Sequence, residues 1–379
     1  MQSRGSRMLA ATVNKESAWR ILGIVVLACS ILGGSSIGVL VNFIPVQTSF
    51  AKNSWRSGII FTTFIIPALI EYYFKRREVD YRGLLTFKQY SFLLLTLVFQ
   101  VLWTAGLIYA SLNIIQSQVY VFNNVHGMYI LLISLFLGVI PARKEWLGLF
   151  LAIVGCVFII MDPKANRIES DGRSEVEQTI WPAIIDLASA FFGALYFIMS
   201  GKNVKSVPVC FLILLMNMHS WVINGLIAKY QDSAIDLFSF DVQTGCLGFM
   251  NVADQALLPL FCYALFASFF GSAGYVLCLL FYSPLVTSNA YLLEPFFAQL
   301  LGFGLGLDKM PGLMTAIGTL FAVAGIFYID AGGRDRQESQ QEEIPIEKEN
   351  GEEQINLSRT INQSGIMSLN VSHYSAGRR

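Results

Sequence analysis

Three long stretches of the chain contain no charged side chain. Residues 21–51, 89–142 and 255–293 lack Asp, Glu, Lys and Arg altogether. A helix of about 20 apolar residues crosses the ~30 Å hydrocarbon core of a bilayer, so some of these stretches are long enough for two crossings. Charged residues make up 14% of the 379 residues, against about 25% in an ordinary soluble domain. The sequence therefore predicts an all-α polytopic membrane protein.

Short polar segments divide the apolar stretches into ten predicted transmembrane spans. Pro141 and Pro311 mark two hinges, because the missing N–H and the fixed φ of proline favour the start of a helix. The spans are expected at residues 18–43, 55–74, 90–111, 114–138, 145–161, 180–200, 206–228, 256–281, 285–307 and 311–330. An even number of spans places both termini on the same side of the membrane.

The distribution of Lys and Arg indicates which side that is. Cytosolic loops of multi-pass proteins carry an excess of these residues. With the N-terminus inside, most of the 26 Lys and Arg residues fall on the cytosolic side, and the short loops at residues 76–77 and 143–144 carry the clearest signal. Both termini are therefore predicted to be cytosolic. The sequence leaves the choice between the plasma membrane and an endomembrane open.

An internal repeat relates the two halves of the chain. Residues 131–160 and 301–330 align at an offset of 170 with eight identities. A proline and two glycines recur at the same spacing, as Pro141/Pro311, Gly148/Gly318 and Gly155/Gly325. Upstream, "TAG" (104–106) pairs with "SAG" (272–274). Each unit holds five spans, and a tandem copy of an odd-numbered unit enters the membrane from the opposite side, which predicts two inverted five-helix repeats.

The repeat divides the chain into five predicted parts. These are a cytosolic N-terminal segment (1–17), the first repeat (18–161), an acidic non-cytosolic linker (162–179), the second repeat (180–330) and a cytosolic tail (331–379). Seven Glu and one Lys occupy residues 338–353. Such a segment has too little apolar surface to bury, so the tail is predicted to be disordered.

Four segments resemble the EamA-type repeats of the drug/metabolite transporter superfamily, to which the solute carrier 35 proteins also belong. They are "WRSGIIFTTFIIPALI" (55–70), "LGVIPARKEWLGLFLAIVGCVFII" (137–160), "YLLEPFFAQLLGFGLGLDK" (291–309) and "LGLDKMPGLMTAIGTLFAVAGIFYI" (305–329). The resemblance implies ten helices in two inverted repeats around a central substrate cavity, and export or exchange of small metabolites. The chain departs from the family pattern in span four, which has "NNVH" (123–126) where a proline is usual.

Polar residues inside the predicted spans are the candidates for a binding site. Asn113, Gln116, Tyr120, Asn123 and Gly127 share one face of span four by their 3–4 spacing. An amide facing lipid would be unpaired, so this face is expected to meet protein or water; hydrogen bonding between helices is the alternative to a cavity wall. The substrate-binding candidates are Gln100, Trp103, Gln116, Tyr120, Asn123, Asn124, Asn217, Trp221, Tyr275, Tyr291 and Glu294.

Glu294 is the most unusual of these residues, because a charged group at the centre of a bilayer costs roughly 3 kcal/mol on insertion scales. By the repeat offset it matches Asn124. Three roles stay open: a proton-coupling site, a partner for a cationic group of the substrate, or a structural acceptor for a helix freed near Pro295. Asp186 and Arg56 are expected to reach the membrane interface instead.

The sequence excludes several function classes. It has no nucleophile–base set and no phosphate-binding glycine loop, so we expect no enzyme and no cofactor. His126 and His219 have no second ligand at metal-binding spacing, so no metal is expected. The net charge is zero and no basic patch is present, which argues against nucleic acid. A homodimer stays open.

The sequence favours a transporter that moves a small polar organic metabolite, the size of an amino acid or a nucleobase, by alternating access across a lipid bilayer. An organellar exchanger of nucleotide sugars or organophosphates is the first alternative. It would need a cation in the cavity, and no Lys or Arg can be placed centrally in the predicted spans. A membrane scaffold that acts through its tail is the second alternative.

Overall fold

The computed structural model describes residues 4–46, 48–77, 79, 86–114, 116–162, 175–251, 263–307 and 310–342. Within these segments, the regular elements are helices, and one isolated bridge joins Asp236 to Gly245. The elements are α1 (Arg4–Leu40), η1 (Val41–Phe43), α2 (Ser49–Lys75), α3 (Phe87–Asn113), α4 (Gln116–Asn123), α5 (His126–Phe136), α6 (Arg143–Ile160), α7 (Glu175–Asn203), α8 (Val209–Gln231), η4 (Gly248–Met250), η5 (Tyr263–Ala273), α10 (Gly274–Cys278), α11 (Pro284–Ala290), η6 (Tyr291–Leu293), α12 (Glu294–Gly304) and α13 (Leu313–Glu342).

Within the described residues, helices overlap the predicted spans, and seven of these helices are long and apolar enough to cross a membrane. The seven are Ala18–Phe43, Ser49–Lys75, Gln89–Asn113, Gln116–Phe136, Trp181–Asn203, Val209–Gln231 and Leu313–Gly333. Many of their large apolar side chains are exposed on the outer surface, where lipid tails would cover them. The prediction of an all-α membrane protein is therefore confirmed at this level. The number of ten spans stays a prediction, and residues 256–262 of the eighth predicted span lie outside the described residues.

Two details differ from the predictions. Asn113 ends α3 and is exposed, so it does not belong to the polar face of span four. The last helix continues to Glu342, so residues 331–342 of the predicted disordered tail are helical. Lys144 Nζ lies 2.8 Å from Asp335 Oδ2 and ties this extension to the start of α6. The rest of the predicted tail lies outside the described residues.

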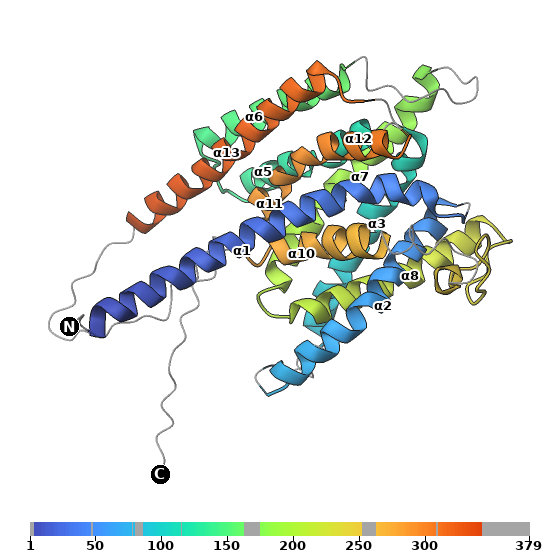
Figure 1. Cartoon of the computed structure of the whole chain (residues 1–379), viewed down its shortest axis with the longest axis horizontal. Coiled ribbons are helices and arrows are strands. Elements are labelled where there is room, and N and C mark those ends of the chain that lie inside the picture. The colour runs from blue at the N-terminus through green and yellow to red at the C-terminus, as the bar shows by residue number, and fades with distance from the viewer. Residues whose placement is uncertain are drawn as a thin grey trace, which may run out of the picture.

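The helices pack in pairs drawn from the two halves of the chain. Helix α6 lies against α13, α2 against α8, α3 against α7, and α1 against η5. Figure 1 shows the α6–α13 pair at one end of the molecule and the α2–α8 pair at the other, with α1, α10 and α12 between them. Each half therefore buries its apolar surface mainly against the other half.

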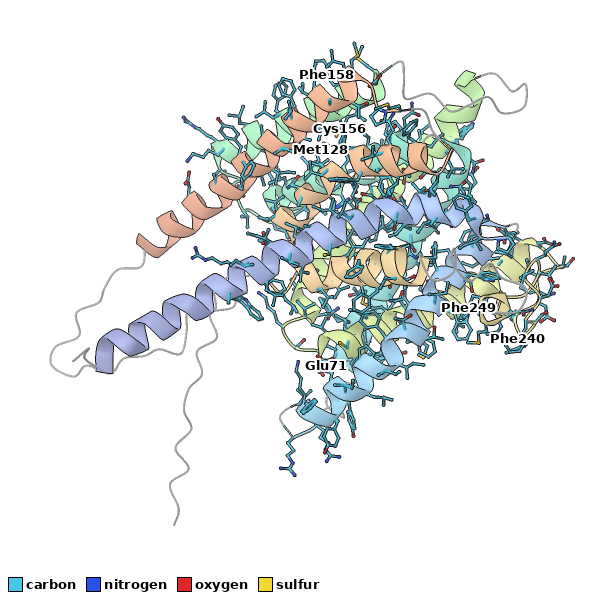
Figure 2. The ribbon with its side chains drawn as sticks, viewed as in Figure 1. Glu71, Met128, Cys156, Phe158, Phe240 and Phe249 are labelled. Atoms are coloured by element: carbon cyan, nitrogen blue, oxygen red, sulfur yellow. The ribbon has the colours of Figure 1, made fainter. Side chains whose placement is uncertain are left out.

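Glycines bring α6 and α13 into backbone contact. A Cβ added at Gly148 would overlap the carbonyl oxygen of Gly325, and one added at Gly155 would overlap that of Gly318. The residue numbers rise along one helix as they fall along the other, so the two helices run antiparallel. Beside this crossing, the ring of Phe158, labelled in Figure 2, stacks on that of Phe321 of α13. Their centroids are 5.7 Å apart.

Glu71 fixes the junction between α2 and α8 (Figure 2). Its carboxylate accepts hydrogen bonds from the backbone N–H groups of Val209, Cys210 and Phe211, which open α8. The first N–H groups of a helix have no partner within it, so an acceptor supplied by another helix satisfies them. Lys75, one turn further along α2, also lies 2.9 Å from Glu71.

Candidate functional site

Two of the helical spans are interrupted, and polar residues lie at both interruptions. Helix α4 ends at Asn123, and α5 begins at His126 after a two-residue turn that contains Asn124. The corresponding span of the second half tightens to a 3-10 turn instead, because the short helix η6 joins α11 to α12, which begins at Glu294. Irregular backbone at membrane depth is tolerated only where it is buried in protein or lines a cavity.

Glu294 connects the two interruptions. Its side chain is fully buried. Oε2 accepts a hydrogen bond from Asn124 Nδ2 (3.0 Å) and Oε1 accepts one from the Tyr275 hydroxyl (2.9 Å). Asn124 Nδ2 also donates to the carbonyl of Tyr291. Each carboxylate oxygen therefore has a neutral donor, and no ion pair involves Glu294 among the described residues.

Helix α1 closes this site from the side, and two glycines allow its close approach. A Cβ at Gly34 would overlap Glu294 Oε1 and would lie 2.7 Å from the Tyr275 hydroxyl. The Tyr120 hydroxyl donates to the carbonyl of Gly34 (2.7 Å) and accepts from the N–H of Gly38 (2.8 Å). These are the two groups that an α-helix normally joins directly, so Tyr120 bridges a turn of α1.

Aromatic rings continue the site toward α3 and α7. The rings of Tyr275 and Tyr291 meet edge to face, with centroids 4.5 Å apart. Trp103 lies 5.3 Å from Tyr275, and its Nε1 donates to Asn123 Oδ1 (2.8 Å). Edge-to-face rings interact favourably through their quadrupoles, so these side chains hold one another in fixed positions.

Asn123 joins the rings to a second buried carboxylate. Asn123 Nδ2 donates to Asp186 Oδ1 (2.9 Å), which also receives the Ser189 hydroxyl at 3.3 Å. Asp186 Oδ2 has no partner among the described residues. We call the set made by these contacts the central polar cluster: Gly34, Trp103, Tyr120, Asn123, Asn124, Asp186, Tyr275, Tyr291 and Glu294.

The structure brings seven of the predicted site residues into this cluster: Trp103, Tyr120, Asn123, Asn124, Tyr275, Tyr291 and Glu294. Gln116 lies one helical turn before Tyr120, at the edge of the cluster. A Cβ added at Gly38 of α1 would overlap its Oε1. Gln100 and Asn217 are buried, but no contact links them to the cluster. Trp221 packs against Phe61 and Phe249, toward the 232–251 segment, and lies apart.

Asp186 and Arg56 correct two expectations. Both were expected at the membrane interface, yet their exposed fractions are 0% and 2%. The Asp186 carboxylate meets the side chains of Asn123 and Ser189 inside the helix packing instead of reaching an interface. Arg56 lies in the first half of α2, which packs against α8 and η5. Neither burial could be predicted without knowing which helices cover these residues.

Comparisons with known proteins define the fold but not the function. Neither a family model nor a curated protein matches the sequence. Chains of solved structures match the fold, and one of them, described only as the crystal structure of a protein, superposes with a TM-score of 0.52. It shares 13% identity with this chain, and the alignment covers 83% of this chain and 98% of the other. At that identity the similarity concerns the fold alone.

The class that fold and site define is an all-α, multi-pass membrane protein with a buried polar cluster at its centre. The seven long apolar helices indicate a multi-pass membrane protein. The hydrogen bonds around Glu294 define the buried polar cluster.

Proposed function

We propose that the protein is a transporter of the drug/metabolite superfamily, EamA type, that moves a small polar organic metabolite by alternating access. The cargo we propose has the size of an amino acid or a nucleobase. In such transporters the substrate site lies near the bilayer midplane, between two repeats and beside broken helices. The interruptions at Asn124 and at residues 291–293 fit that arrangement.

The glycine crossing supports two inverted repeats. By the offset of 170, Gly148 corresponds to Gly318 and Gly155 to Gly325. In the structure Gly148 meets Gly325, and Gly155 meets Gly318. A two-fold axis produces this pattern, in which residue i of one unit contacts j of the other and j contacts i. An axis that relates antiparallel helices in this way would lie in the membrane plane.

The "TAG" and "SAG" segments give a second, independent support. A Cβ at Gly106 would overlap Ser189 of α7, and one at Gly274 would lie 2.5 Å from the hydroxyl of Ser30 in α1. In the first contact, the sixth span presents Ser189 to Gly106 of the third span. In the second, the first span presents Ser30 to Gly274 of the eighth span, and the two glycines correspond in the repeat. Both contacts join the two halves of the chain.

The observation that carries the proposal is the hydrogen bond between Asn124 and Glu294, 170 residues apart. Residues that correspond under a two-fold operation touch each other only near the axis. A fully buried polar cluster therefore lies where a site shared by both halves is expected. Buried polar groups in a membrane are costly and mark substrate or ion pathways, and a scaffold that acts through its tail has no need of them.

Transport by the reconstituted full-length protein tests the proposal. We expect liposomes that contain the protein to exchange at least one radiolabelled compound from a panel of amino acids, nucleobases and sugar phosphates. The variant Asn123→Ala should lose most of this exchange because it removes the link between Trp103 and Asp186, whereas Asn113→Ala, exposed at the end of α3, should retain it. Exchange no faster than in empty liposomes for the whole panel would contradict the proposal.

A further inference from the structure

Arg56 is a buried cation that no described residue neutralises. Its side chain is 2% exposed and ranks among the largest fully buried ones. Among the described residues it takes part in no ion pair, and its Nε has no hydrogen-bond partner. A guanidinium stays charged in proteins and is costly to bury without a partner. Its burial therefore needs an explanation that packing does not give.

Tyrosines of four other elements interact with the Arg56 guanidinium. Arg56 interacts electrostatically with Tyr120 of α4, Tyr196 of α7, Tyr263 of η5 and Tyr275 of α10. All four are buried, and the Tyr263 hydroxyl has no hydrogen-bond partner in the described part of the chain. Helix η5, which carries Tyr263, packs against α2, so a cation and a hydroxyl donor come from neighbouring helices. Neither Arg56 Nε nor the Tyr263 hydroxyl has an acceptor among the described residues.

The buried acids of the central polar cluster, Glu294 and Asp186, form no ion pair with Arg56. Glu294 receives its hydrogen bonds from Asn124 and Tyr275, and it forms no ion pair with Arg56. Tyr120 and Tyr275 interact electrostatically with Glu294 as well as with Arg56. These two tyrosines therefore interact with both a positive group and an acidic one, which form no ion pair with each other.

The other buried basic residue of α2 is used differently. Lys52 Nζ donates to the carbonyls of Ile44 (2.7 Å) and Val41 (3.2 Å), at the end of the first span. It satisfies helix-end carbonyls that have no partner of their own. Arg56, four residues later, has no equivalent contact within the described part of the chain, so its charge is available to a ligand.

We propose that Arg56 binds an anionic group of the transported solute, a carboxylate or a phosphate, with the Tyr263 hydroxyl as a second donor. The inference rests on the proposed transport function and narrows the class of cargo. The planar guanidinium donates two parallel hydrogen bonds to either kind of oxyanion. An anion in this place would provide the counter-charge that the described residues do not.

Thermal unfolding of the purified full-length protein tests the site with matched probes. Benzoate and benzamide have the same shape but differ in charge, and phenyl phosphate supplies the phosphate group. We expect benzoate or phenyl phosphate, but not benzamide, to raise the unfolding temperature in a saturable way. A response to benzoate alone indicates a carboxylate solute, and a response to phenyl phosphate alone indicates a phosphate ester.

Variants then assign the effect to Arg56. Arg56→Gln should weaken binding of the active probe about tenfold or more, because it removes one member of a buried charge pair. Arg56→Lys keeps the charge in case the first variant fails to fold, and it should weaken benzoate binding because the planar fork is lost. Lys144→Gln, at an exposed position, should bind as the wild type does. Unchanged affinity in any folded Arg56 variant, or equal responses to benzoate and benzamide, would overturn the proposal.

The outcome separates this proposal from transport itself. If neutral solutes are exchanged across liposomes while no anionic probe binds, the anion site is refuted and the transport function stands. If benzoate binds through Arg56 while no compound of the panel is exchanged, the anion site stands and the transport function is refuted.

Discussion

Glu294 and Gly34 depend on each other at the centre of the molecule. The carboxylate occupies the space that a side chain at Gly34 would fill, and it receives hydrogen bonds from Asn124 and Tyr275. The described part of the chain provides no cation beside it. A buried carboxylate with neutral donors can serve as a structural acceptor or carry a proton during transport, and substitution distinguishes the two roles.

Replacing Glu294 by Gln tests proton coupling. We expect the variant to fold and to lose the dependence of transport on pH, because an amide does not titrate in this range. Tyr120 and Tyr275, the other titratable groups that interact with Glu294, ordinarily titrate near pH 10. The measurement is the initial rate of uptake between pH 5 and 8 in proteoliposomes, with Asp335→Asn as an exposed control. A pH profile identical to that of the wild type leaves only the structural role.

Replacing Gly34 by Ala tests the close approach of α1. The added methyl group would displace Glu294 and Tyr275, and overpacking of this kind typically costs about 1–3 kcal/mol. We expect a lower unfolding temperature in detergent. Gly304→Ala is the control, because nothing lies within 4 Å of the added atom there. Equal stability of the two variants would show that α1 does not pack as described.

The sequence predicted the candidates better than it predicted their surroundings. Glu294 and Asn124 were chosen because polar groups are rare in apolar spans, and the repeat offset paired them; the structure places them in contact. The depth of Arg56 and Asp186 depends instead on where α2 and α7 begin and on which helices cover them. Those facts arise from contacts between segments far apart in the chain, which local patterns do not encode.

At the scale of helices, the apolar runs predicted where the spans lie but not where they break. Span four has no proline at its break, between Asn123 and His126. His126 Nδ1 lies 2.8 Å from the Asn123 carbonyl, and Asn124 bonds to residues of the other half. Bonds of side chains to backbone groups compete with the helix there, and these tertiary contacts could not be foreseen from the periodicity.

Glu71 provides a test of how α2 and α8 are joined. Glu71→Ala removes the acceptor for three N–H groups and should cost about 0.5–2 kcal/mol, as the loss of other helix caps does. Lys75→Ala removes only the ion pair with Glu71, and pairs of that kind contribute about 0–1 kcal/mol. Unfolding in mixed detergent compares the two. If Lys75→Ala were the more destabilising, the ion pair and not the cap would hold the junction.

The crossing of α6 and α13 provides a test of symmetry between elements. Gly155→Ala and Gly318→Ala each place a methyl group against the carbonyl oxygen of the other glycine. We therefore expect the two variants to lower the unfolding temperature by similar amounts, each by more than Gly304→Ala does. A large effect from one glycine with none from the other would contradict the symmetric contact.

At the scale of the whole molecule, the two halves bury their surfaces against each other in four helix pairs, and the central polar cluster lies between them. Alternating access requires that this cluster open to one side of the membrane and then to the other. The alternative is a permanently closed polar core that only holds helices together. The two arrangements differ in whether reagents reach the cluster, and that difference can be measured without knowing the solute.

The most direct measurement is the labelling of a cysteine at position 30 from each side of a sealed membrane. Ser30 is fully buried, and its hydroxyl lies 2.8 Å from that of Tyr291; Ser30→Cys would be made in a chain that lacks the six native cysteines. We predict that a membrane-impermeant maleimide labels it from either side, whereas Lys144→Cys reacts only from the cytosol and Ser233→Cys only from the opposite side. Labelling of position 30 from one side only, or from neither, would contradict alternating access.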